Sequence, residues 1–152
     1  MNLVSLLFSP STTSLGRLPM AAPLRVISGR ENISLDGEWR FKLVSTPTAA
    51  PDGWQHSQAP TDANGWRPIT VPGSWTRQNT ADLPHYTNVI MPWDAQPPLV
   101  PADNPTGLYR TTFDRPESER VTVSFGGAEA MLVVWCNGQL VGMGKDLSLI
   151  HI

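Results

Sequence analysis

Two apolar stretches joined by a pair of turn-forming residues decide the fold. Residues 130–143 read AMLVVWCNGQLVGM, with Asn137 and Gly138 between the apolar stretches. Asparagine followed by glycine tolerates positive φ at both positions, which favours a two-residue type I′ turn. The sequence therefore predicts a β-hairpin whose strands cover 130–135 and 140–143 and whose tip is Asn137-Gly138.

The same strand signal recurs toward the N-terminus. Residues 35–44 read LDGEWRFKLV, in which Trp39, Phe41 and Leu43 alternate with charged residues, as in a strand with one buried face. Further strand-like stretches follow at residues 67–71, 107–113 and 120–125. The chain also has 15 prolines and 12 glycines, and these interrupt any helical pattern. Many short strands and no predicted helix indicate an all-β fold, an antiparallel sandwich or a barrel.

Length and charge narrow the functional classes. The 152 residues suffice for one domain but not for a sandwich plus an α/β barrel of about 250 residues. A formal net charge of −2 offers no basic face for nucleic acid. The N-terminal apolar run is shorter than the ~20 residues of a membrane span. A signal peptide would require a basic residue near its start, and no Lys or Arg precedes Arg17. We expect a cytoplasmic protein that binds neither nucleic acid nor a membrane.

Boundaries and reactive side chains follow from composition. Residues 1–24 are rich in Ser, Thr and Pro and are expected to form a flexible arm before a domain at 25–146. The single cysteine, Cys136, cannot form an internal disulfide and is expected to be a small buried core residue. The histidines lie far apart and pair with no cysteine, so no metal site is expected in this chain.

Four segments carry a family resemblance. They are LDGEWRF at 35–41, VPGSW at 71–75, YTNV at 86–89 through PPLVP at 97–101 to NPTGLY at 104–109, and WCNGQLVG at 135–142. Their order resembles the N-terminal sugar-binding domain of family 2 glycoside hydrolases of the bacterial β-galactosidase type, over residues 30–146. The resemblance implies a galactose-binding-domain-like jelly roll that is incomplete at its C-terminus. Residues 147–152 depart from the family pattern and are expected to be a non-family tail.

Asn88 is the candidate binding residue. It lies in a long proline-bounded loop, and its amide offers both a donor and an acceptor for sugar hydroxyls. From the residues alone, a loop asparagine that bonds its own backbone is the competing interpretation. The resemblance implies that Asn88 contacts the galactosyl group of a β-galactoside, with Val89 alongside, at the active site of a barrel domain in the same parent chain.

Catalytic groups are expected elsewhere. Retaining glycosidases use two carboxylates about 5 Å apart, and the resemblance places both on the downstream barrel of a parent that cleaves terminal β-D-galactose residues. Glu117 and Glu119 flank a turn next to Pro116 and are predicted to be solvated surface charges. The resemblance also implies Mg and Na for the full-length enzyme, none in this chain, and a homo-oligomeric parent. The isolated chain is therefore predicted to be inactive.

Alternatives remain for the aromatics and for the function. Trp39, Trp75 and Trp135 are predicted core residues, and sugar-stacking platforms are the other interpretation. The domain could instead be a stand-alone carbohydrate-binding module, or a structural domain whose arm docks another subunit. The test that separates these hypotheses is whether the encoding DNA continues in frame into a barrel with two glutamates.

Overall fold

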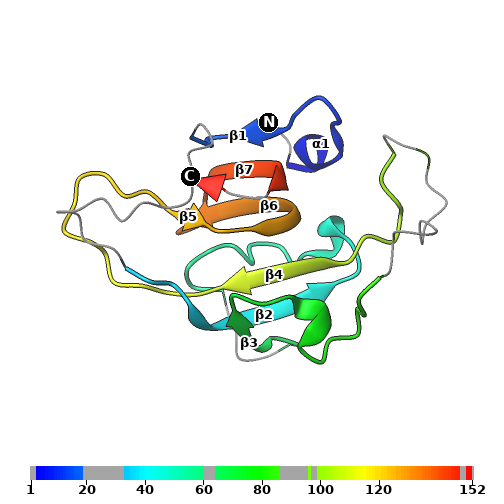
Figure 1. Ribbon diagram of the computed structural model, residues 1–152, viewed down its shortest axis with the longest axis horizontal. Helices are drawn as coiled ribbons and strands as arrows, with labels where there is room; N and C mark the ends of the chain where they lie inside the picture. The colour runs from blue at the N-terminus through cyan, green and yellow to red at the C-terminus, as the bar shows by residue number, and fades with distance from the viewer. Residues whose placement is uncertain are drawn as a thin grey trace. The chain divides into compact units, whose positions relative to one another are not determined.

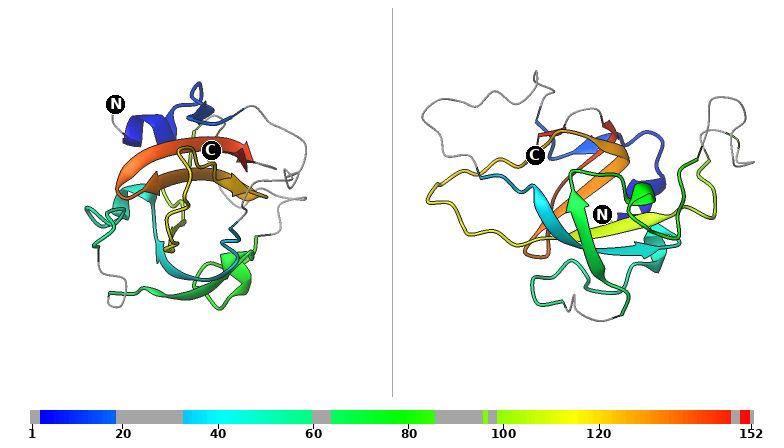
Figure 2. Two further views of the ribbon diagram at one scale, coloured as in Figure 1. Left: turned by 90° about the vertical axis from the view of Figure 1, so that its left-hand side faces the viewer. Right: turned by 60° about the horizontal axis from the view of Figure 1, so that its bottom comes forward.

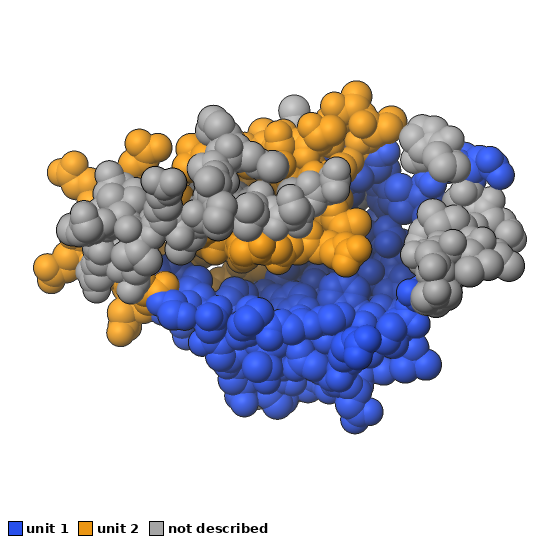
Figure 3. Space-filling view, viewed as in Figure 1, with its two compact units in different colours: residues 1–8, 34–54, 60–113 blue, residues 9–33, 55–59, 114–152 orange. Residues whose placement is uncertain are grey.

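The computed structural model describes residues 3–18, 33–59, 64–85, 96, 99–147 and 150–151. The chain divides into two compact units, which Figure 3 colours separately. Unit 1 comprises Met1–Phe8, Ser34–Trp54 and Pro60–Phe113. Unit 2 comprises Ser9–Ile33, Gln55–Ala59 and Asp114–Ile152. Each unit has its own antiparallel sheet (Figure 1).

Unit 1 is built on a three-stranded sheet in the order β3-β2-β4 (Figure 1). Its strands are β2 (Gly37–Val44), β3 (Arg67–Val71) and β4 (Thr106–Arg110). The predicted alternation in β2 centres on Phe41, which is only 1% exposed and lies opposite both Arg67 and Tyr109. The strands predicted at 35–44 and 67–71 are therefore confirmed, whereas the one predicted at 107–113 ends at Arg110.

A turn after β3 folds back onto that strand. The short 3₁₀ helix η2 (Trp75–Arg77) follows the strand, and Gln78 is the next residue. The side-chain amide of Gln78 bonds to β3 in the way that the backbone of a neighbouring strand would. The Thr70 N–H donates to Gln78 Oε1 at 2.8 Å, and Gln78 Nε2 donates to the Thr70 carbonyl at 2.9 Å. A Cβ on Gly73 would lie 2.6 Å from Gln78 Nε2, so glycine permits this close approach.

Unit 2 contains the predicted hairpin. Strands β6 (Ala128–Cys136) and β7 (Gln139–Leu147) pair with each other, and the ribbon they form curves along its length (Figure 2). Cys136 lies opposite Gln139, which leaves a two-residue turn in which Asn137 has φ 49° and Gly138 has φ 82°. Positive φ at both turn residues is the type I′ signature, so the predicted hairpin and its tip are confirmed.

Two expectations in unit 2 are wrong. Only β5 (Ser124–Phe125) forms within the strand predicted at 120–125, where it pairs with β8 (Ile150–His151), and Val121 is 49% exposed. Alternation of apolar and polar residues gives a segment an apolar face, but it does not provide the neighbouring strand with which the segment must pair. Cys136, expected in the core, is exposed. It is the last residue before the turn, and successive strand residues point to opposite faces, so half-buried Trp135 and Cys136 face different environments.

The N-terminal segment contains local structure where it is described. Helix α1 (Leu3–Phe8) opens the chain, and β1 (Ser14–Leu15) pairs with β7. Lys145 holds this segment by two hydrogen bonds. Its backbone N–H donates to the Thr13 carbonyl at 2.9 Å, and its Nζ donates to the Ser9 carbonyl at 2.6 Å. Mobility of residues 1–24 stays a prediction.

Helix is scarce in the rest of the described chain. Between residues 33 and 147 the described residues contain only two 3₁₀ helices, η1 (Pro47–Ala49) and η2. None of the helices in the described ranges has the length and apolarity that a bilayer span requires. The predicted all-β, antiparallel fold class is confirmed.

Gly138→Ala should destabilise the chain. The substitution forces a side chain into positive φ, and the added Cβ would lie 2.5 Å from His56 Nδ1. Strain of this kind should lower the free energy of unfolding by about 1–2 kcal/mol, measured by urea denaturation. Gly126→Ala is the matched control, because a Cβ there meets no heavy atom within 4 Å. Equal stability of the two variants would contradict the close fit at the hairpin tip.

Candidate functional site

The predicted contact residues Asn88 and Val89 lie outside the described residues. In this region the description ends at His85 and, apart from Gln96, resumes at Leu99. The structure of unit 1 does include the point where the chain leaves for this segment and the point where it returns. We call residues 75–85 and 99–107 the loop base, and the side chains that hold it define the candidate site.

Aromatic packing fixes one side of the loop base. The Phe41 ring lies 4.9 Å from that of Tyr109 and 6.2 Å from that of Trp75, measured between ring centroids. Trp39 joins the group by an edge contact with Tyr109 at 6.4 Å. A Cβ on Gly107 would lie 2.8 Å from Phe41 and 2.9 Å from Trp75, so the missing side chain lets both rings approach β4. The core interpretation of Trp39 and Trp75 fits these contacts.

The cluster also carries a half-buried phenol and a nearby cation. Burial raises the pKa of Tyr109 from 10.0 to about 12, because the charged phenolate loses hydration there. Tyr109 is therefore neutral at physiological pH and serves as packing rather than as a charged group. The Arg67 guanidinium carbon lies 5.7 Å from the centre of the Phe41 ring, a cation–π distance.

A carboxylate holds the polar end of Trp75. Trp75 Nε1 donates to Asp82 Oδ2 at 2.6 Å, and His85 Nε2 lies 3.6 Å from the other oxygen, Oδ1. The Asp82 side chain is only 12% exposed, whereas that of His85 is 55% exposed. Thr80 Oγ1 donates to the Trp75 and Asp82 carbonyls at 3.1 and 2.9 Å. Sequence reasoning missed Asp82, because contacts within an irregular loop leave no periodic signal.

The returning side of the loop base is held through the backbone. The Asn104 N–H donates to the Ser45 carbonyl, just after β2, at 3.1 Å. Thr106 Oγ1 then donates to the Asn104 carbonyl at 3.0 Å. These bonds explain why the NPTG stretch enters β4 at a fixed point. Both ends of the long loop are thus anchored in unit 1.

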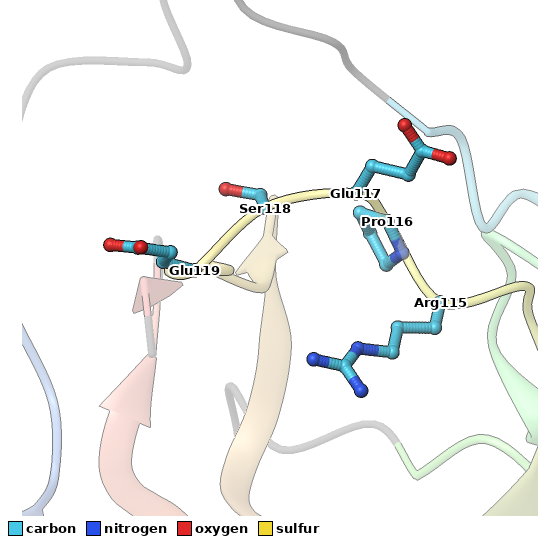
Figure 4. A pocket seen from close by; sticks show the side chains of 5 residues that line it. All are labelled: Arg115, Pro116, Glu117, Ser118 and Glu119. Atoms are coloured by element: carbon cyan, nitrogen blue, oxygen red, sulfur yellow. The ribbon is translucent and has the colours of Figure 1, made fainter.

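The acidic turn of unit 2 does not form a site. A pocket of about 410 Å³ is lined by Arg115, Pro116, Glu117, Ser118 and Glu119. Their side chains point in different directions and do not converge on one position (Figure 4). Glu117 and Glu119 are exposed, as predicted for solvated charges. In the part of the chain that the structure describes, no group of three His, Cys, Asp or Glu residues could hold a metal ion.

Comparisons with known proteins identify the family. Residues 33–149 match the family model described as "Glycosyl hydrolases family 2, sugar binding domain". The chain is 42% identical over 118 residues to a β-galactosidase of Psychromonas ingrahamii, covering 76% of this chain and 11% of that protein. β-Galactosidases of Pseudoalteromonas haloplanktis and Erwinia tasmaniensis are 36% and 35% identical, and each match covers 93% of this chain and 15% of the relative. The chain therefore belongs to the sugar-binding domains of family 2 glycoside hydrolases.

Proposed function

We propose that this chain is the N-terminal domain of a β-galactosidase that hydrolyses terminal non-reducing β-D-galactose residues. One observation carries the proposal: the chain is similar to β-galactosidases over 76 to 93% of its own length while spanning only 11 to 15% of theirs. A stand-alone binding module or an assembly domain has no comparable support. The side chains of Glu117 and Glu119 in unit 2 point in different directions (Figure 4).

The proposed contribution of the chain is a scaffold and one substrate-contact loop. The anchored loop base would present Asn88, with Val89 beside it, to the galactosyl group bound at the parent's barrel domain. An amide suits this role because it donates and accepts hydrogen bonds at the same time. Cleavage with retention would be carried out by two carboxylates of the barrel.

Other features of the parent belong to the same proposal. Mg and Na, which the family resemblance implies for the full-length enzyme, are proposed to bind to parts of the parent outside this chain. We further propose a cytoplasmic, homo-oligomeric parent. These assignments follow from the family resemblance and are tested on the full-length enzyme by metal analysis, by fractionation of cells and by measurement of its mass in solution.

Replacing Asn88 with alanine in the parent enzyme tests the proposed contact. If its hydrogen bond strengthens as the sugar ring flattens in the transition state, kcat/KM for an aryl β-galactoside should fall by about 10- to 100-fold, or about 1.4–2.8 kcal/mol. The melting temperature should change little. Steady-state kinetics and thermal unfolding of the same preparation check both expectations.

Two further variants sharpen that test. Asn88→Asp keeps the size of the side chain but loses the N–H donor, and it should also lower kcat/KM. Gln58→Ala removes an exposed amide from unit 2 and should leave kcat/KM within about twofold of the parent value. If Asn88→Ala lowers the melting temperature but leaves kinetics unaltered, the residue bonds its own backbone and the proposed contact is wrong.

A further inference from the structure

The N-terminal segment lies along one border of the hairpin in unit 2. Strand β1 pairs with Met143 and Gly144, so it continues the sheet beyond β7. Lys145 extends this contact by one residue, since its backbone N–H donates to the Thr13 carbonyl at 2.9 Å. Among the described strands, β1 is therefore the one that occupies backbone groups on this side of β7.

Two contacts hold the ends of this segment. At its start, Lys145 Nζ donates to the Ser9 carbonyl at 2.6 Å, a charged and partly buried bond between residues 136 apart in the chain. At its end, Gly16 has φ 62°, and a Cβ on this residue would overlap the Val141 carbonyl oxygen. Glycine fits both this backbone conformation and this space. We call residues 9–16 the latch.

The latch is held by far fewer bonds than the hairpin that it covers. β1 pairs with two residues of β7, whereas β6 pairs with β7 from Ala128 to Cys136. Most residues of the latch are exposed, and Leu15 is 40% exposed. Local opening of a fold begins where few contacts and solvent-exposed bonds hold a segment. The latch should therefore open while the hairpin stays folded.

The border of β7 suits a second copy of the same chain. Residues 130–144 contain no charged side chain, so no charge along the hairpin repels an identical hairpin. Leu140 and Val141, at the contact with Gly16, are each 38% exposed and would add apolar contact. Two copies of one border that meet antiparallel across a two-fold axis satisfy the backbone groups of both.

We propose that residues 9–16 are a latch that closes the border of β7 against β7 of a second copy of the chain. When the latch opens in two copies, their borders pair and a dimer forms. Lys145 holds the closed position through the Ser9 carbonyl, and Gly16 holds it by fitting against Val141. The inference concerns unit 2 alone and does not depend on the proposed function.

Hydrogen exchange of the purified chain, followed by NMR, measures the opening. Lys145→Met removes the bond to Ser9, and Gly16→Ala places a side chain against Val141. Each variant should raise the exchange rate of the amide at position 145, which bonds to Thr13, by about 5- to 10-fold. The amides that join β6 to β7 should keep their rates, because the hairpin stays folded.

Unit 1 offers a matched control for each variant. Lys42 Nζ also donates to a backbone carbonyl at 2.6 Å, that of Asn64, so Lys42→Met removes the same kind of bond elsewhere. Gly65 has φ 83°, and a Cβ there meets no heavy atom within 4 Å, so Gly65→Ala introduces positive-φ strain without an overlap. Both controls should leave exchange at position 145 unchanged.

Sedimentation velocity over a range of concentrations tests the dimer. Because both copies must open, a 5- to 10-fold rise in opening should lower the concentration at which dimers form by about 25- to 100-fold. The unmodified chain and the two controls should dimerise only at the higher concentrations. Unchanged exchange at position 145 in both Lys145→Met and Gly16→Ala would overturn the inference. So would faster exchange without dimers, or equal acceleration of the amides between β6 and β7, which would mean that the variants loosen the whole unit.

Discussion

Phe41→Ala is expected to lower the free energy of unfolding by about 3–5 kcal/mol. Phe41 is 1% exposed and contacts the rings of Trp75 and Tyr109. Removing its ring would leave a cavity beside Gly107, which has no side chain to fill the space. The loss is a large part of the 5–15 kcal/mol by which domains are usually stable. Urea denaturation followed by tryptophan fluorescence measures it, because Trp75 reports directly on the cluster.

Phe113→Ala is the matched control for that prediction. Phe113 belongs to the same unit but is 41% exposed and lies beyond the end of β4. Its truncation should cost less than about 1 kcal/mol, since little apolar surface returns to water. Similar losses for the two variants would mean that the aromatic cluster does not form the core of unit 1.

The purified chain on its own is expected to release no product from an aryl β-galactoside. Hydrolysis with retention needs a general acid and a nucleophile about 5 Å apart, and the proposal assigns both to the parent's barrel. Enzymes accelerate such reactions by at least about a millionfold, so the rates of the parent and of the chain at equal molar concentration should differ by at least that factor. A fluorogenic galactoside assay has the sensitivity to measure this difference.

Contamination by a host β-galactosidase is the main complication, so the chain should be produced in a strain that lacks that enzyme. Turnover that follows the protein through a second purification at constant specific activity would contradict the prediction. The double variant Glu117→Gln/Glu119→Gln addresses the acidic turn of unit 2, whose side chains are exposed and diverge (Figure 4). It should give the same background signal as the unmodified chain.

Local patterns in the sequence were sufficient to predict the best-defined elements. The alternation in β2 and the Asn137-Gly138 turn both depend on neighbouring residues, so the sequence contains all the information that fixes them. The strand predicted at 120–125 failed because a strand also needs a partner, and only Ser124 and Phe125 have one, in β8. Cys136 was wrongly predicted to be buried, because residue type indicates only the average burial of cysteine. Its position next to a turn decides its exposure here.

The candidate site was predictable only in part. Asn88 and Val89 came from the family resemblance and remain predictions. Asp82 could not be identified from sequence, because its bond to Trp75 joins residues seven apart through an irregular turn. Such contacts depend on the path of the backbone, which neither composition nor periodicity specifies. The resemblance did mark the flanking VPGSW and NPTGLY stretches, and the structure shows that both hold the loop base to the sheet.

The side-chain amide of Gln78 has a consequence for how the chain behaves in concentrated solution. Among the described strands β3 is at the border of its sheet, where free N–H and C=O groups would invite a strand from another molecule. Gln78 occupies both backbone groups of Thr70, and Pro68 has no N–H to offer. The turn after β3 thus protects this border against edge-to-edge aggregation.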